Sequence, residues 1–447
     1  MSLLHNDGYL PLGVAVNQQD EVKVDSLLLK DEDSVNAIDF YDRTPIQYAA
    51  QIGNCNIGRK LINAGSNIDR VDGYGVSALH IAACKGHDWF VKLLINMGCY
   101  RDPTSSDGIS PIHCAAGNGR TDTVRTLLEA GVDVDVRGPG NRTPLYMAAE
   151  CGHLDIVKAL VEAKARLNIA SDYGLTPLCT AVLNNKTDVA ICLIKSGARV
   201  NKSDSKNNLP LHHAVRNGNI SIVLELLKSD CDRNILTKNF ESPIHIAVRM
   251  GHVGVLQALI QQGCDVNLCE PVGNVTPLHV AVNVHQDFVV FSKIFCQLLE
   301  GGCILNWRAF STLETPLYRA LELDKNDIAI LLLAHGADPN LASPFDITAL
   351  QKSCQRQKMN IAEMLLNCGI QWKRERWLKH FNQLQGEITN DSKVNDLLRE
   401  WRFTTTTLQK TCRIALRHIL GENLQCKVSQ LPIPEKIQDF LMLSDLM

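Results

Sequence analysis

A six-residue phrase returns at an almost constant interval along most of this chain, and no other feature constrains the fold as strongly. It reads TPIQYA at 44, SALHIA at 77, SPIHCA at 110, TPLYMA at 143, TPLCTA at 176, LPLHHA at 209, SPIHIA at 242, TPLHVA at 276, TPLYRA at 315 and TALQKS at 348. The steps between successive starts are 33 residues six times, then 34, 39 and 33. A fixed period of this length predicts a stack of similar structural units, each of which contacts only its neighbours.

The phrase resembles the T-P-L-H-x-A hallmark of the ankyrin repeat, whose period is 33 residues. Ten copies match, and LPLGVA at residue 10 suggests an eleventh, atypical unit that caps the N-terminal end. The resemblance implies an all-α fold, an ankyrin-repeat solenoid of helix pairs with β-turn fingers. The expected organisation is a capping repeat over 1–40, about ten ankyrin repeats over 41–370 and a helical connector that closes the C-terminal end over 371–403.

The second copy shows how one unit is expected to fold. Ser77 is placed to cap a first helix, and Gly86 is placed to end it. Gly98 is placed to close a second helix with a left-handed residue. The buried face of the first helix is expected to include Leu79, Ile81 and Ala82, and that of the second Phe90, Val91, Leu93 and Leu94.

The eighth copy is followed by a longer step of 39 residues. The extra residues lie around NVHQDFVVFSKIF, between 283 and 295. They are expected to lengthen the first helix, the second helix or the loop that joins them.

Composition narrows the class of protein. The 447 residues carry a formal net charge of -3 and no basic block, so neither nucleic acid nor an anionic membrane is a favoured partner. The N-terminus lacks a secretory signal pattern, and no run of about eighteen apolar residues predicts a membrane span. Sixteen cysteines without a C-x-x-C pair indicate small buried side chains in a reducing compartment, so we expect a cytoplasmic protein that can also be nuclear.

The recurring histidines suggest a metal site or a catalytic base at first sight. Each occupies the same slot of its own repeat, about 10 Å from the next such slot if helices stack at ordinary distances, which is too far for two ligands of one ion. We therefore expect structural histidines that bind backbone groups, no metal, no cofactor and no enzymatic activity. They are His80, His113, His212, His245 and His279, with His87, His153 and His252 in a second recurring position.

The turn before each phrase is expected to project as a finger whose tip residues support no core and are available for binding. Tyrosine, tryptophan and arginine are the usual anchors of protein interfaces. Packing on the next finger, or simple exposure, is the alternative for each of them. The substrate-binding candidates are Tyr41, Arg43, Tyr74, Arg142 and Tyr173, and Trp307 and Phe310 lie in the corresponding stretch of the ninth repeat.

The period ends near residue 370, and a different pattern appears close to the C-terminus. In TLQKTCRIALRHIL, Leu408, Cys412 and Leu416 are spaced by four residues and share one face of a helix that Ile419 continues, with Thr407 at its N-cap. TLQKTCRIAL resembles the elongin-binding box of the suppressor-of-cytokine-signalling (SOCS) module. A segment of about forty residues is too small to bury an adequate core alone, so this face is expected to need a partner.

A second box follows at LPIP. Leu431, Pro432, Ile433 and Pro434 resemble the cullin-5 box of the same module, and the two prolines fix an extended backbone. Both boxes, in this order behind an ankyrin array, identify the chain as a member of the ankyrin repeat and SOCS box family, with a three-helix SOCS box over 404–447.

The resemblance implies a non-catalytic substrate receptor of a RING ubiquitin ligase. Leu408, Cys412, Leu416 and Ile419 would dock on elongin C, which brings elongin B. The segment 431–434 would favour cullin-5, with its RING protein, over cullin-2. The ankyrin array would hold an unidentified protein substrate for ubiquitination. The alternative is an ankyrin scaffold or inhibitor that sequesters a protein partner, with a tail that folds back on the solenoid.

Overall fold

The computed structural model describes residues 11–30, 32–309, 313–341, 343 and 347–370. Within these ranges the fold is all-helical, with 22 α-helices, two short 3-10 helices and one isolated β-bridge between Val71 and Ser77. The predicted all-α ankyrin solenoid is confirmed for this part of the chain. The predicted connector over 371–403 and the SOCS box lie outside the described residues.

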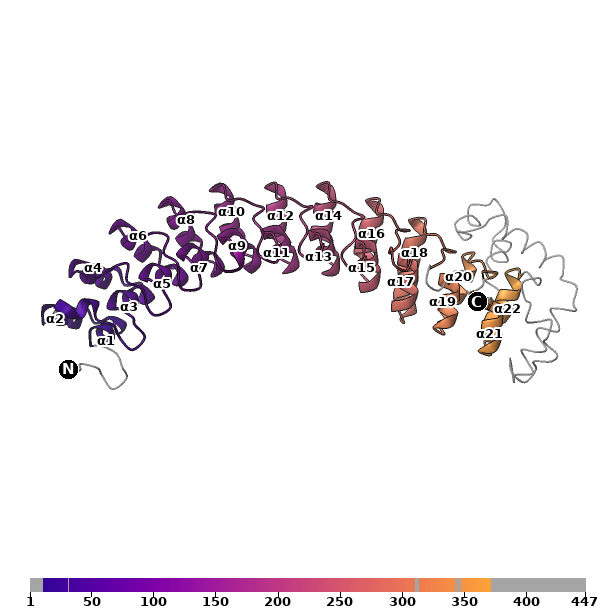
Figure 1. Ribbon diagram of the computed structural model, residues 1–447, viewed down its shortest axis with the longest axis horizontal. Helices are drawn as coiled ribbons and strands as arrows, with labels where there is room; N and C mark the ends of the chain where they lie inside the picture. The colour runs from indigo at the N-terminus through magenta and orange to yellow at the C-terminus, as the bar shows by residue number, and fades with distance from the viewer. Residues whose placement is uncertain (1–10, 31, 310–312, 342, 344–346, 371–447) are drawn as a thin grey trace, which may run out of the picture. The chain divides into compact units, whose positions relative to one another are not determined.

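The described residues form two compact units, which meet in the sequence between Cys231 and Asp232. In the first unit, helix pairs follow one another in chain order (Figure 1). The first helices of these pairs are α1 (Pro11–Asn17), α3 (Pro45–Ile52), α5 (Ala78–Lys85), α7 (Pro111–Gly117), α9 (Pro144–Cys151), α11 (Pro177–Leu183) and α13 (Pro210–Arg216). The second helices are α2 (Glu21–Lys30), α4 (Cys55–Asn63), α6 (Asp88–Asn96), α8 (Thr121–Glu129), α10 (Leu154–Glu162), α12 (Thr187–Lys195) and α14 (Ile220–Lys228). The 3-10 helices are η1 (Glu32–Asn36) and η2 (Pro139–Asn141).

The second unit repeats the same arrangement with four described pairs. Its first helices are α15 (Pro243–Met250), α17 (Pro277–Val284), α19 (Pro316–Glu322) and α21 (Ala349–Gln355). Its second helices are α16 (Val253–Gln261), α18 (Phe288–Glu300), α20 (Asn326–Ala334) and α22 (Met359–Asn367).

The recurring phrase explains where the first helices begin. Thr143 has extended backbone angles, its hydroxyl accepts the amide of Tyr146 at 3.2 Å, and Pro144 fills the first helical position, where no amide proton is needed. Gly152 ends the same helix with φ 90, a left-handed conformation that glycine adopts without steric cost.

The core consists of small and aliphatic side chains from both helices of each pair. In α5 and α6, Ala82, Leu79 and Phe90 are buried, and so are the other expected residues of α6, Val91, Leu93 and Leu94. The expectation for Ile81 was wrong, because this side chain is half-buried and faces the side of the fingers. His80, one residue earlier, is only 2% exposed and takes the buried position.

The long eighth step is accommodated mainly in the second helix. Helix α18 has 13 residues, whereas α16 and α20 have 9 each. Its added turn brings Phe291 and Phe295 into a stacked pair with ring centroids 5.7 Å apart, and Phe295 meets His335 edge-on at 5.0 Å. Of the three alternatives, lengthening of the second helix is the main one observed, and the joining loop, 285–287, is one residue longer than the loop 251–252 of the preceding repeat.

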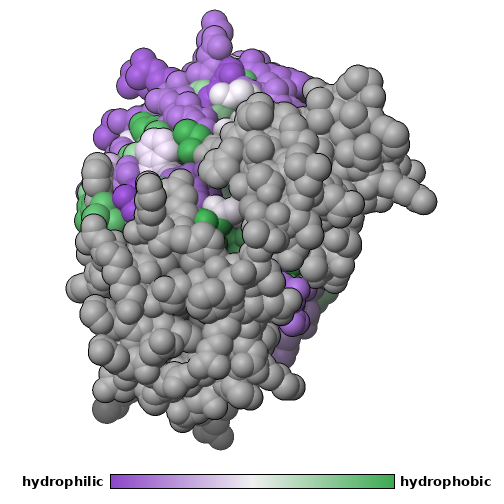
Figure 2. Space-filling model, turned by 90° about the vertical axis from the view of Figure 1, so that its right-hand side faces the viewer, coloured by the Kyte–Doolittle hydropathy of each residue, from purple (hydrophilic) through white to green (hydrophobic). Residues whose placement is uncertain are grey.

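Figure 2 shows one face of the molecule. Among the coloured residues of Figure 2, hydrophilic ones predominate and hydrophobic ones form small separate patches. None of the helices in the described ranges is both long and apolar enough to cross a membrane.

Candidate partner-binding groove

An aspartate at the base of the finger shapes the tip in the second repeat. The carboxylate of Asp72 accepts the backbone amides of Tyr74 at 3.0 Å and Val76 at 2.9 Å. Asp39 holds the preceding finger in the same way, through the amides of Tyr41 and Arg43. Because the carboxylate satisfies the backbone of the turn, the tip side chain is left to point outward, and Tyr74 is 74% exposed.

The recurring histidine joins each finger to the next unit. In α5, Nδ1 of His80 lies 3.1 Å from the amide of Ser77, and Nε2 lies 2.9 Å from the carbonyl oxygen of Ile109 in the following finger. The same bond to the following finger recurs in three other repeats, between His113 and Arg142, His245 and Val275, and His279 and Glu314. The structural role predicted for these histidines is confirmed.

Glutamine replaces histidine in the first of the ten repeats without loss of the bond. Oε1 of Gln47 accepts the amide of Thr44 at 2.8 Å, and its Nε2 donates to the carbonyl of Val76 at 2.7 Å. The second recurring position also bonds to backbone, since Nε2 of His87 lies 3.1 Å from the carbonyl of Gln51. His153 contacts the carbonyl of Gly117 in the same way at 3.2 Å.

Burial keeps these rings neutral. Desolvation lowers the pKa of His80 and His113, and it lowers the pKa of His245 and His279 to about 4. With one ring nitrogen accepting an amide and the other donating to a carbonyl, the imidazole has no lone pair left for a metal ion. The described residues contain no group of three or more side chains placed to hold one.

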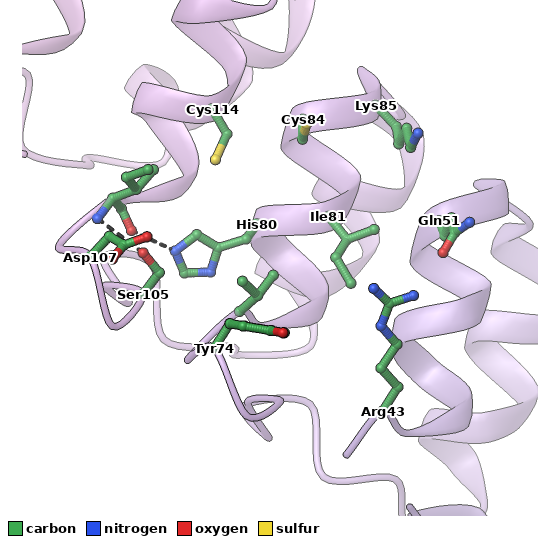
Figure 3. A pocket seen from close by; sticks show the side chains of 12 residues that line it. Arg43, Gln51, Tyr74, His80, Ile81, Cys84, Lys85, Ser105, Asp107 and Cys114 are labelled. Carbon is green, nitrogen blue, oxygen red and sulfur yellow. Dashed lines mark hydrogen bonds between the residues drawn. The ribbon is translucent and has the colours of Figure 1, made fainter. Parts of the chain in front are cut away.

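The fingers and first helices of the first three complete repeats enclose a groove of about 440 Å³ (Figure 3). Helix α5 forms its floor, with α3 on one side and the finger before α7 on the other. Two of the predicted substrate-binding residues, Arg43 and Tyr74, line it. The remaining lining residues are Gln51, Val76, His80, Ile81, Cys84, Lys85, Ser105, Asp107, Ile109 and Cys114.

The other predicted substrate-binding residues lie outside this lining. Tyr41 is 55% exposed, with the guanidinium of Arg43 5.9 Å from its ring centroid. Tyr173 is 66% exposed on a later finger. Arg142 is engaged within the protein, because it pairs with Glu150 at 3.4 Å and lies 5.3 Å from the ring centroid of Tyr146.

The structure describes one of the two candidates of the ninth repeat and none of those of the C-terminal module. Trp307 is half-buried in the second unit, and Phe310 lies outside the described residues. The docking residues of the C-terminal module also lie outside them, namely Leu408, Cys412, Leu416, Ile419, Leu431, Pro432, Ile433 and Pro434.

Sequence reasoning missed the groove residues contributed by the helices. Ile81 follows the histidine slot by one residue, and Cys84 follows it by four. Residues at this spacing share one helical face, and in α5 this face is turned toward the fingers. Reading both positions in every repeat would have found Gln51, Ile81 and Cys84 together.

Comparisons with known proteins match both parts of the chain. The family model described as ankyrin repeats (3 copies) matches residues 2–107, 49–138, 79–171, 131–204, 164–237, 211–291 and 244–343. The model described as SOCS box matches residues 404–442. A human protein, 2-5A-dependent ribonuclease, is 44% identical over 62 residues, which is 13% of this chain and 8% of that protein. The chain thus spans less than a tenth of that relative, a stretch of about two repeats.

Proposed function

We propose, from the premise that this chain belongs to the ankyrin repeat and SOCS box family, that it is the substrate-recognition subunit of a cullin-5 RING ubiquitin ligase containing elongin B and elongin C. A SOCS box indicates binding to elongins and to a cullin-based ligase in general, and ankyrin repeats with a SOCS box are typical of non-catalytic adaptors. The observation that carries the proposal is the SOCS box match over 404–442 behind the array of repeats.

The C-terminal module supplies the ligase contacts in this proposal. Leu408 enters a pocket on elongin C, and Cys412, Leu416 and Ile419 pack beside it. The segment 431–434 contacts cullin-5, which brings its RING protein. Such a ligase acts on proteins of the cytoplasm or nucleus, which is where we place this chain.

The repeat array supplies the substrate contacts. The groove over α5 brings together exposed aromatic, aliphatic and charged side chains on a rigid scaffold, as protein-recognition surfaces do. The second candidate function is an ankyrin scaffold or inhibitor that holds a partner without ubiquitinating it. The same groove would serve that function, so the module at the C-terminus separates the two.

The test is co-purification of the full-length protein with elongin B, elongin C and cullin-5. A Leu408→Asp, Cys412→Asp double variant should lose the elongins and cullin-5 together, because two carboxylates cannot enter an apolar pocket without a large desolvation cost. Alanine at 431–434 should lose cullin-5 and keep the elongins. Arg43→Ala, far from the module in sequence, is the matched control and should keep all three.

Two results would contradict the proposal. Absence of the elongins from the wild-type preparation would favour the scaffold. Retention of the elongins by the double variant, with unchanged circular dichroism, would remove the assigned docking residues.

A further inference from the structure

We propose that the groove over α5 binds an acidic segment of the substrate, in which a carboxylate side chain pairs with Arg43 and Lys85 while an apolar neighbour packs on Ile81 and Tyr74. This inference rests on the proposed function, because that function makes the ligand of the groove a substrate. It adds the chemistry by which the substrate is recognised.

The argument begins with two arginines at the same position of different repeats. Arg43 directly precedes Thr44, and Arg142 directly precedes Thr143. In both repeats the seventh residue after the threonine lies on the first helix and faces the arginine. This residue is Gln51 beside Arg43 and Glu150 beside Arg142. Arg142 pairs with Glu150 at 3.4 Å.

Arg43 has no such partner. Gln51 is neutral, and Arg43 forms no ion pair with any residue in the described ranges. Its guanidinium is half-buried at the edge of the groove. In one repeat the carboxylate of Glu150 pairs with Arg142. In the other, Arg43 has no carboxylate beside it, so a carboxylate of a bound ligand can take the equivalent place.

A second cation stands on the same side of the groove. Lys85 ends α5 in an exposed position and, like Arg43, makes no ion pair with another described residue. Cations on the corresponding face of the second unit are paired instead. These pairs are Arg249 with Glu241 at 2.7 Å, Arg319 with Glu314 at 3.7 Å and Lys352 with Glu322 at 2.5 Å. Arg43 and Lys85 therefore differ from these three cations, each of which has a carboxylate partner within the protein.

The floor between the charges is apolar. Ile81 projects toward the guanidinium of Arg43, with Tyr74 on the finger beside it (Figure 3). Asp107 lies with Ser105 on the opposite side, at the finger before α7. Along a bound segment, one end would therefore lie beside the positive charges, the middle would pack on the apolar floor, and the other end would lie beside the carboxylate of Asp107. A second acidic residue at the Asp107 end would be repelled, which fixes the direction of the segment.

The probe that tests the inference is a random dodecapeptide library displayed on phage and selected on the full-length protein, both alone and in complex with elongin B and elongin C. We expect enrichment of Asp or Glu beside Leu, Ile, Val or an aromatic residue. A synthetic copy of the most enriched peptide is then compared with its Asp→Asn or Glu→Gln counterpart by fluorescence polarisation at low and high salt.

The most informative variant is Gln51→Glu, which copies the Arg142–Glu150 pair into the first repeat. It should weaken binding of the acidic peptide about tenfold, as should Arg43→Ala, because each removes a charge partner from the ligand. Lys158→Glu is the matched charge control, since Lys158 is 53% exposed on α10 and does not line the groove. This control should bind the peptide as the wild type does.

The inference is overturned if no peptide is enriched, if enriched peptides lack acidic residues, or if Gln51→Glu binds the acidic peptide with wild-type affinity. Unchanged thermal melting of Gln51→Glu, an exposed substitution, separates loss of binding from loss of fold. Retention of the elongins by each variant is measured in the same samples. If the groove binds no acidic peptide while the elongins stay bound, this inference is wrong and the ligase proposal stands. If the elongins do not bind while acidic peptides are still selected, the ligase proposal is wrong and the groove still recognises acidic segments.

Discussion

The Nε2 atom of His80 lies 2.9 Å from the carbonyl oxygen of Ile109, which belongs to the next finger along the chain. This bond crosses from one repeat to its neighbour, while Nδ1 of the same ring accepts the amide of Ser77 within its own repeat. A single side chain thereby fixes the start of a helix and the position of the following finger.

His80→Ala should therefore destabilise the protein by about 1–3 kcal/mol, because it leaves buried backbone groups without partners. His80→Gln should cost clearly less, since Gln47 makes both equivalent bonds in the first complete repeat. Urea denaturation and hydrogen exchange of the finger at 105–109 measure the difference. Equal losses for alanine and glutamine would show that the ring, and not its hydrogen bonds, is what the site requires.

Stability should fall as the pH drops from about 6.5 to about 4. Burial lowers the pKa of His245 and His279 to about 4, whereas an unfolded histidine has a pKa near 6.5. The unfolded chain therefore takes up protons first in this window, and the stabilisation present above pH 6.5 is lost as the pH falls.

The linked free energy is at most about 3 kcal/mol for each of these two histidines. His245→Gln removes one of the linked groups and should flatten the pH dependence of hydrogen exchange in α15. An unaltered slope in this variant would mean that other groups carry the acid sensitivity.

Gly58→Ala should be destabilising although alanine is the better helix former. A Cβ atom at Gly58 in α4 would lie 2.5 Å from Cε2 of Phe90, which is fully buried in α6. We expect a loss of about 1–3 kcal/mol, the usual range for overpacking. Gly13→Ala is the matched control, because the nearest atoms of Tyr48 would be 3.6 Å away, an ordinary contact.

The control should be neutral or stabilising by up to about 1 kcal/mol, the helix preference of alanine over glycine. Thermal melting of the two variants distinguishes the outcomes. Equal melting temperatures would show that α4 and α6 separate without cost. Phe90→Leu in the Gly58→Ala background should recover part of the loss.

A cysteine that lines the groove should not react faster with a thiol reagent than a cysteine elsewhere on the protein. Among the cysteines of the described ranges, Cys151 and Cys296 are the exposed ones and should react first with a maleimide at neutral pH, although burial raises the pKa of Cys151. Cys114 lines the groove, but desolvation raises its pKa to about 12, so very little thiolate forms. Cys99 and Cys264, each with a pKa raised to about 11, should also react slowly.

Peptide mass spectrometry after timed labelling gives the order. Labelling of Cys114 as fast as Cys151 would contradict the burial of its sulfur.

The sequence was sufficient for the repeating parts of this structure. Thr143 and Pro144 act through local backbone chemistry that most copies share, so the starts of the first helices could be predicted from the phrase. Gly152, which follows the phrase, marks the end of the helix in the same local way. The role of His80 followed from its fixed slot, because a residue that recurs every 33 positions meets the same backbone each time.

The groove could not be predicted as completely. Ile81 belongs to an apolar helix, and periodicity alone placed it on the buried side, although the adjacent finger leaves room beside it. Arg142 fitted the pattern of an exposed anchor. Its pairing with Glu150 arises only because the finger folds back along α9, which brings side chains eight positions apart in the sequence into contact. Such contacts depend on the path of the backbone and not on the period.

The Arg142–Glu150 pair also suggests how binding specificity can change in evolution. Glutamine and glutamate codons differ by a single base, so one mutation at position 51 would give Arg43 an internal partner, and one at position 150 would release Arg142 from its own. Position 51 is exposed, position 150 is half-buried, and neither belongs to the buried core. A repeat array of this kind can therefore move its recognition site from one repeat to another by point mutation, without passing through an unfolded intermediate.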